Sequence, residues 1–436
     1  MYPWSIRAAA VLLAALPALA GAAERPTIEI GSPDFRPLPI AVAQFQGDAD
    51  PEARRAAGDV TDVVRADLTL SGLFDVLDPK GFLAETGEGL SAPTIKFARW
   101  VDVGAEGLVK ARLRAAGPEL EGELHLYEVR AGREALAQTY RVSATAPRDL
   151  GHRIADAVLQ YYTHEPGVFR TKIVAIRKNR DLRELVVYDA DGRNGRVLLS
   201  ERALMLLPSW RPDGREILVT SYRSGRPELW VFRLADRSFR KLIGVGELAM
   251  GGVYSPDGSR IAFSATESNN TDVWVADADG SNPRRLTRDP AIDVSPSWSP
   301  DGKRIAFVSD RAGTPQIYVM YADGSSPRRL TFQGNYNQTP QWSPRGDLIA
   351  FTARDERKVF DVFAISPDSG RIQRLTQDQG RTNEEPTWAP NGRLIAFTTD
   401  RGGSPQIVIS DPRGDRQTVV TTGSELMTPA WGPLPK

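Results

Sequence analysis

Hydrophobic and polar positions alternate with a short period through the last two thirds of the chain. Short apolar runs, such as residues 305–308 and 316–321, are separated by turns rich in Ser, Pro, Asp and Gly. One unit, an aromatic residue followed by a Ser-Pro-Asp-Gly-like turn, recurs at Trp210, Tyr254, Trp298, Trp342, Trp388 and Trp431, with spacings of 44, 44, 44, 46 and 43 residues. A period of about 40–45 residues with several short strands per unit is typical of a β-propeller blade.

The two ends of this repeat region complete each other. The last copy stops at residues 431–433 and lacks the three strands that follow the turn in the other copies. Strand-like segments at 172–176, 184–189 and 196–200 precede the first complete copy and fit the second, third and fourth strands of a blade. We therefore predict an all-β six-bladed propeller over residues 166–436, closed by a composite blade, because such closure removes exposed sheet edges.

A different pattern precedes the repeats and predicts a small mixed α/β domain over residues 39–165. Strands are expected at 40–45, 108–113, 120–129 and 135–143, and helices at 51–71 and from about Pro147 onward. Residues 23–38 are rich in proline and glycine, which predicts an extended N-terminal arm.

Residues 1–22 predict a signal peptide. A short apolar run from Ala8 to Ala20 follows Arg7, and small residues at positions 18, 20 and 22 suit cleavage. The run is shorter than a membrane-spanning helix requires, although an uncleaved anchor is the alternative. The chain has no cysteine, which excludes lipid attachment to a cysteine, disulfides and thiolate metal sites.

Charge and motifs argue against several classes of function. Lys+Arg and Asp+Glu both total 55, so neither nucleic acid nor insertion into a membrane is indicated. No Gly-x-Ser-x-Gly, Walker or dinucleotide-binding motif occurs, and His125, His152 and His164 all precede the propeller, where surface or partly buried polar roles are expected. The Asp-x-Asp-Gly turns at Asp189 and Asp277 lack the acidic twelfth position of a calcium loop. No catalytic residue and no metal ligand is predicted.

The loops that lead into the first strand of each blade are the candidate site, because they converge on the channel mouth of a rigid scaffold. They combine carboxylates, amides and apolar side chains, a mixture typical of a protein-binding surface. The predicted contact residues are Leu248, Met250, Asp293, Asn337, Asn383, Glu384 and Met427. The alternative is that the apolar members pack inward.

A signal peptide, a small α/β domain and six WD40-like Trp-Ser-Pro-Asp-Gly repeats, in this order, resemble the TolB family of the Tol-Pal envelope system. The junction Gly167-Val-Phe-Arg-Thr-Lys-Ile173 and the segments Tyr321-Ala-Asp-Gly324 and Gly334-x-x-Asn-Gln-x-Pro340 are similar to that family as well. The resemblance covers essentially the whole mature chain.

The resemblance implies a non-enzymatic, monomeric periplasmic adaptor that supports outer-membrane integrity and invagination during division. It implies that the mouth binds the peptidoglycan-associated lipoprotein Pal, with bacteriocins as a further class of partner. It also implies that the arm, through Glu24, Ile28, Ile30 and Phe35, binds the inner-membrane protein TolA. Leu248 stands where relatives carry a histidine, and calcium is associated with the family channel, although no ligand set is recognisable here and no cofactor is predicted.

Two other classes of function remain as alternatives. One is a propeller that gates, or recognises substrates for, a secreted peptidase. The other is a propeller enzyme of the lactonase or sugar-dehydrogenase type.

Overall fold

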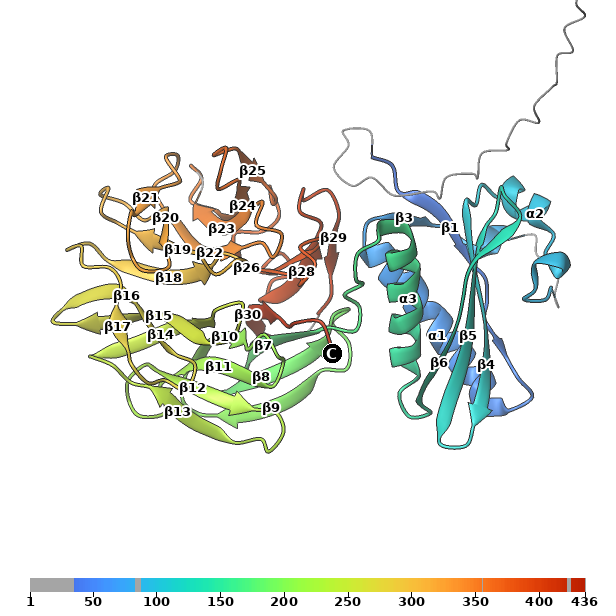
Figure 1. Cartoon of the computed structure of the whole chain (residues 1–436), viewed down its shortest axis with the longest axis horizontal. Coiled ribbons are helices and arrows are strands. Elements are labelled where there is room, and N and C mark those ends of the chain that lie inside the picture. Colours follow the sequence, from blue (N-terminus) through green and yellow to red (C-terminus); the bar gives the residue numbers. More distant parts are fainter. Residues whose placement is uncertain (1–34, 83–87, 355, 422–424, 436) are drawn as a thin grey trace, which may run out of the picture.

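A computed structural model describes residues 35–82, 88–354, 356–421 and 425–435, which form a small α/β domain beside a β-propeller (Figure 1). The predicted signal peptide and the arm residues Glu24, Ile28 and Ile30 lie outside the described residues. Among the described residues, no helix is long and apolar enough to cross a membrane.

The small domain is built on a mixed sheet with the strand order β3-β1-β4-β5-β6, to which β2 adds by pairing with β4. The strands are β1 (Leu38–Val42), β2 (Gln46–Gly47), β3 (Phe74–Val76), β4 (Gly107–Ala116), β5 (Glu119–Glu128) and β6 (Arg133–Ser143). β1 lies parallel to β3 and β4, whereas β4, β5 and β6 form an antiparallel meander. The sequence pattern predicts four of these six strands and misses the short β2 and β3.

Helices cover both faces of this sheet. The helical elements are α1 (Pro51–Leu70), α2 (Phe97–Asp102), α3 (Pro147–Thr163) and two short 3₁₀ turns, Pro79–Gly81 and Ala92–Thr94. Asp50 caps α1 by accepting hydrogen bonds from the N–H groups of Glu52 and Ala53. α1 and α3 bury their apolar faces against one side of the sheet, and both helices lie between the sheet and the propeller (Figure 1).

The propeller has six four-stranded antiparallel sheets, as the repeats predict. The first three blades are β10 (Met205–Trp210), β11 (Glu216–Ser221), β12 (Glu228–Arg233), β13 (Phe239–Ile243); β14 (Leu248–Tyr254), β15 (Arg260–Glu267), β16 (Asn270–Asp277), β17 (Arg284–Arg285); and β18 (Asp293–Trp298), β19 (Arg304–Ser309), β20 (Gln316–Tyr321), β21 (Arg328–Arg329). The next two are β22 (Asn337–Trp342), β23 (Ile349–Arg354), β24 (Phe360–Ile365), β25 (Ile372–Arg374); and β26 (Asn383–Trp388), β27 (Ile395–Thr399), β28 (Gln406–Ser410), β29 (Gln417–Val419).

The sixth blade is composite and closes the ring. Its order is β30-β7-β8-β9, from β30 (Glu425–Trp431), β7 (Lys172–Asn179), β8 (Leu182–Asp189) and β9 (Arg196–Glu201). The predicted closure by strands from both ends of the repeat region is therefore confirmed. β30 pairs antiparallel with β7 along its length, so the innermost strand comes from the C-terminal end of the chain.

The repeated aromatic residues lie between neighbouring blades, as the sequence predicts. Trp298 is buried and donates from Nε1 to the carbonyl oxygen of Val253 in the preceding blade at 3.2 Å. Trp388 makes the same contact with Gln341 at 2.9 Å. The hydrogen bond and the burial of a large ring together fix the spacing between adjacent sheets.

The small domain contacts the end of the propeller at which the Trp-Ser-Pro-Asp-Gly turns lie. Glu165, in the segment between the domains, accepts hydrogen bonds from Arg345 at 2.8 Å and from Arg393 at 2.6 and 2.7 Å. Phe35 packs on the small-domain core, and the guanidinium of Arg413 lies 5.2 Å from its ring centroid. The first strand of each blade begins at the opposite face of the propeller, which the described residues of the small domain do not cover.

Candidate functional site: the mouth of the propeller channel

The innermost strand of every blade contains a β-bulge at the same position. The bulge is formed by the two residues that lie three and two positions before the blade aromatic. The residue at the bulge has a left-handed backbone with φ between 50° and 64° in all six blades: Leu207, Gly251, Ser295, Thr339, Glu385 and Thr428. Only one of the six is a glycine, so five positions hold a side chain in a strained conformation that costs roughly 1–2 kcal/mol each. Strain of this kind concentrates where a scaffold must aim side chains at a ligand.

A proline follows the bulge in five blades and Gly252 follows it in the sixth. Proline has no N–H to donate to the ladder and is tolerated at bulges for that reason. The six bulge residues, most of these prolines and all the blade aromatics except Trp298 line a cavity of about 270 Å³ inside the channel.

Three consecutive positions before and at the start of each bulge define the mouth. The outer ring consists of Leu204, Leu248, Ile292, Tyr336, Thr382 and Glu425, and the inner ring, two residues later, consists of Leu206, Met250, Val294, Gln338, Glu384 and Met427. All twelve side chains are half-buried or exposed. The position between the rings is buried in every blade: Met205, Ala249, Asp293, Asn337, Asn383 and Leu426.

The three predicted polar contacts, Asp293, Asn337 and Asn383, occupy this buried position and have partners inside the propeller. Asp293 accepts from Arg311 Nη2 at 2.8 and 3.1 Å. Asn337 donates to Gln316 Oε1 at 2.9 Å. These side chains support the first strand of their blade, and direct contact with a partner through them stays a prediction.

Asn383 forms the most extensive of these contacts. Its Nδ2 donates to Asp361 Oδ1 at 3.1 Å, in the third strand of the preceding blade, and its Oδ1 accepts from Thr399 Oγ1 at 2.8 Å. The side chain therefore joins two neighbouring blades while it is fully buried.

The predicted residues Met250, Glu384 and Met427 all lie on the inner ring, and Leu248 lies on the outer ring. The site prediction missed the other members of both rings. A signal for them is present in the sequence, because the proline two residues before the blade aromatic marks the bulge in five blades, and the inner ring is two residues before that proline.

Two carboxylates lie in the channel. Glu384 accepts from Gln338 Nε2 at 3.3 Å across the boundary between two blades, and burial raises its pKa. Glu385 accepts from the Thr428 N–H at 2.6 Å and from Thr398 Oγ1 at 3.2 Å, and burial raises its pKa to about 7. The propeller segment contains neither histidine nor cysteine, so these acids have no such partner with which to form a nucleophile–base pair.

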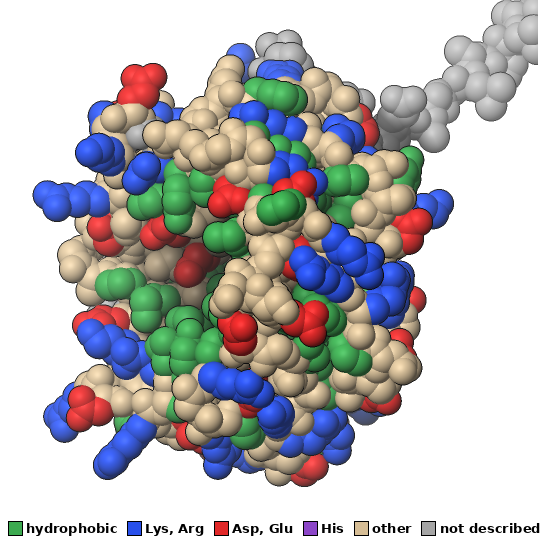
Figure 2. All heavy atoms as spheres, turned by 90° about the vertical axis from the view of Figure 1, so that its left-hand side faces the viewer, with side chains coloured by type: hydrophobic (Ala, Val, Ile, Leu, Met, Phe, Trp, Pro, Cys, Tyr) green, Lys and Arg blue, Asp and Glu red, His purple; other side chains and the backbone are tan. Residues whose placement is uncertain are grey.

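The mouth is chemically divided. The three blades that begin with β10, β14 and β18 present only apolar side chains on both rings, including Leu204 at 36% exposure and Ile292 at 52%. The blades that begin with β22 and β26 present Tyr336, Gln338, Thr382 and Glu384. Figure 2 views this face: it is hollow at its centre, with hydrophobic side chains at the border of the hollow and acidic side chains in and around it.

Phe35 is the one predicted arm residue that the structure describes. It is half-buried between the small-domain core and Arg413 of the propeller. It is therefore held at the contact between the two domains, and its role in partner binding stays a prediction.

Comparison with known proteins agrees with this architecture. The chain matches the family model described as the TolB amino-terminal domain over residues 26–135 and the model described as the TolB beta propeller domain over residues 159–435. Tol-Pal system protein TolB from Anaeromyxobacter sp. (strain K) is 69% identical over 427 residues, which cover 98% of each chain. The Tol-Pal system protein TolB from Myxococcus xanthus (strain DK1622) is 48% identical over 222 residues, which cover 50% of this chain and 49% of that one.

A solved structure extends the similarity to three dimensions. The crystal structure of TolB from Acinetobacter baumannii superposes with a TM-score of 0.82 at 27% identity, covering 92% of this chain and 97% of that one. Neither a peptidase gate nor a lactonase-type enzyme is supported by these relatives. The chain belongs to the TolB family, the non-enzymatic periplasmic components of the Tol-Pal system.

Proposed function

We propose that the channel mouth binds a Pal-like, peptidoglycan-associated lipoprotein and that the N-terminal arm, after cleavage of the signal peptide, binds a TolA-like inner-membrane protein. The observation that carries the first part is the divided mouth: an apolar sector of Leu204, Leu206, Leu248, Met250, Ile292 and Val294 beside a polar sector that contains Glu384. Exposed apolar side chains grouped in this way mark an interaction surface.

The chemistry of the two sectors specifies the partner surface. The apolar sector requires aliphatic or aromatic side chains, and methionines at Met250 and Met427 allow the surface to adapt to them. Within the described residues Glu384 forms one hydrogen bond and no ion pair, so it favours a cationic or hydrogen-bond-donating group on the partner. A rigid scaffold with a hollow centre fits a protruding segment of a folded protein.

Replacing Ile292 with Asp tests the apolar sector. Ile292 is 52% exposed, so the substitution leaves the core intact, but it places a charge in the proposed contact. We expect at least tenfold weaker binding of the Pal-like protein by calorimetry, since a central contact is worth about 1.4 kcal/mol or more.

Tyr321→Asp is the matched control. Tyr321 is 55% exposed and ends β20, in the same blade as Ile292 but at the opposite end of the propeller. Its variant should bind within about twofold of the wild-type chain. Equal affinity of the wild-type and Ile292→Asp chains would place the binding site elsewhere.

Removal of residues 23–34 tests the arm. The chain should melt as before, because the described core begins after this segment, and it should lose binding to a TolA-like partner while retaining binding to the Pal-like one. Full TolA affinity after truncation would exclude the arm as the contact.

A further inference from the structure

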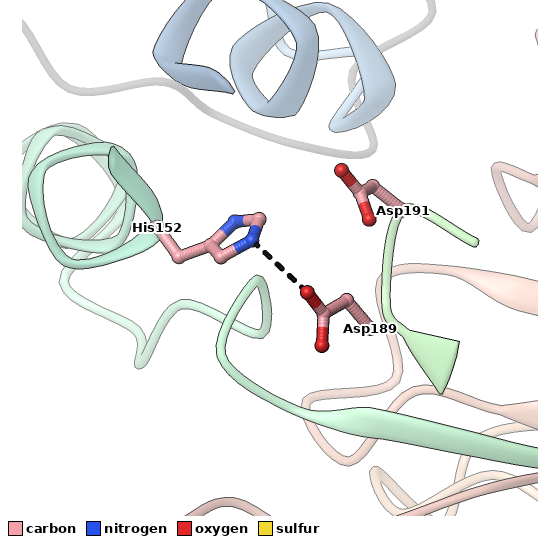
Figure 3. A group of neighbouring side chains, drawn as sticks. All are labelled: His152, Asp189 and Asp191. Carbon is pink, nitrogen blue, oxygen red and sulfur yellow. Dashed lines mark ion pairs between the residues drawn. The ribbon is translucent and has the colours of Figure 1, made fainter. Parts of the chain in front are cut away.

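A polar cluster at the contact between the two domains is not explained by partner binding. His152 lies in α3 and is 4% exposed, and its Nδ1 is 2.7 Å from Oδ2 of Asp67, a fully buried residue of α1. A carboxylate at Nδ1 fixes the orientation of the imidazole ring and places a proton on that nitrogen. Nε2 is thereby directed at the propeller (Figure 3).

The end of β8 and the turn that follows it face this nitrogen: Asp189 is the last residue of β8, and Asp191 lies in the turn. Nε2 of His152 forms no hydrogen bond, and the nearest oxygen of Asp189, Oδ2, is 3.9 Å away. One donor atom each from His152, Asp189 and Asp191 lie within 4.8 Å of one another. A separation of 3.9 Å is too long for a hydrogen bond. It is a few tenths of an ångström longer than the roughly 3.3–3.6 Å between two tetrahedral ligands that each lie about 2.0–2.2 Å from one ion, so a small closing movement of the two side chains would let them share that ion.

Neighbouring cations hold the two carboxylates in place, but they do not occupy the space between His152 Nε2 and the aspartates. Lys172 pairs with Asp189 Oδ1, and Arg148 pairs with Asp191. Asp189 Oδ2 accepts from Asn194 Nδ2 at 2.7 Å and retains a further lone pair.

We propose that His152 Nε2, Asp189 and Asp191 form a site for a divalent transition-metal ion, with Zn²⁺ as the expected ligand. One imidazole and two carboxylates are a donor set suited to zinc, and the adjoining cavity of about 910 Å³ has room for a water molecule at the remaining coordination position. The pairing of Asp67 with the other imidazole nitrogen is the arrangement that orients histidine ligands in metal sites.

The site lies across the domain boundary, since His152 belongs to the small domain and both aspartates belong to the composite blade. An ion bound there would join the two domains directly, which neither partner-binding surface requires. The inference is therefore independent of the proposed function.

Zinc binding by the untagged mature chain, stripped with EDTA, tests the proposal by calorimetry and by thermal melting. We expect one Zn²⁺ per chain and a melting midpoint that rises with zinc concentration. Ca²⁺ at the same concentration should leave both readouts unchanged, because calcium prefers oxygen ligands. Failure of Zn²⁺ to bind, or stabilisation by Ca²⁺ alone, would overturn the assignment and leave a protonated imidazole between the acids.

Three variants locate the ion. His152→Asn removes Nε2, and Asp191→Asn removes a carboxylate from the half-buried end of the cluster; each should weaken zinc binding at least tenfold. His164→Asn is the matched control, because His164 is exposed at the left-handed C-cap of the same helix, a conformation that Asn tolerates. Asp191→Asn alone decides the outcome if His152→Asn does not fold, and zinc binding by Asp191→Asn equal to wild type refutes the site.

Discussion

Replacement of Asn383 by Ala should destabilise the propeller instead of selectively removing a binding contact. The side chain is fully buried and joins Asp361 to Thr399 through hydrogen bonds of 3.1 and 2.8 Å. After the substitution Asp361 Oδ1 keeps its bond from Thr376, at 2.5 Å, whereas the hydroxyl of Thr399 loses its acceptor. One buried donor without an acceptor costs about 1–3 kcal/mol, which lowers the melting midpoint by roughly 2–5 °C for a cooperative unit of the size of the propeller.

Urea and thermal unfolding followed by tryptophan fluorescence measure this change. Glu384→Gln is the neighbouring control, because its half-exposed side chain keeps its shape and should alter stability by less than about 0.5 kcal/mol. The reasoning is refuted if Asn383→Ala melts like the wild-type chain while binding of the Pal-like protein falls tenfold, since the side chain would then be a partner contact.

Two further predictions concern closure of the ring and the channel acid. Deletion of residues 426–436 removes most of β30 together with buried Leu426 and Trp431, so calorimetry should show a lower and broader transition; an unchanged transition would contradict the composite blade. Burial raises the pKa of Glu385 to about 7, so the folded state binds more protons than the unfolded state between about pH 4.5 and 7, and the stability from this proton is lost as pH rises through that window. The difference in free energy of unfolding between Glu385→Gln and the wild-type chain should therefore shift by roughly 1–2 kcal/mol in favour of the variant from pH 5 to pH 8, after allowance for solvent in the channel. Urea unfolding of both chains at the two pH values measures this shift, and an unchanged difference would show that the pKa of Glu385 is not raised.

The sequence predicts the blades well because each blade repeats one local pattern. The spacing of the repeats, the residues of their turns and the two incomplete ends are enough to predict six blades and a last blade built from both ends of the repeat region. The same pattern is insufficient at the mouth, because the bulge adds a residue and so breaks the alternation that assigns side chains to faces. Asp293 and Asn337 therefore lie on the buried side, one residue before the half-exposed inner ring.

The domain contact was harder to predict for a different reason. Asp67, His152 and Asp189 are far apart in sequence and belong to two helices and a propeller strand, so their spacing in the sequence does not indicate that they lie together. One residue of the domain contact is recognisable in the sequence. The turn that carries Arg345 has arginine where most copies have aspartate, and this arginine contacts Glu165 between the domains.

Residues that differ from the repeat therefore occur in two places on the propeller: at the contact with the segment between the domains and at the mouth of the channel. The contact of the blade aromatic with the preceding blade recurs, as at Trp298 and Trp388, because each blade meets a neighbour of nearly the same shape. Asn391 and Arg345 depart from the repeat where the propeller contacts the segment between the domains, with Asn391 donating to the carbonyl of Pro166 at 3.1 Å. The side chains on the two rings vary around the mouth, from Leu204 and Leu206 in one blade to Thr382 and Glu384 in another, although all six blades share the bulge that positions them. Identical rings would give a sixfold-symmetric surface, whereas the different side chains above the shared bulges would select one orientation of the proposed partner.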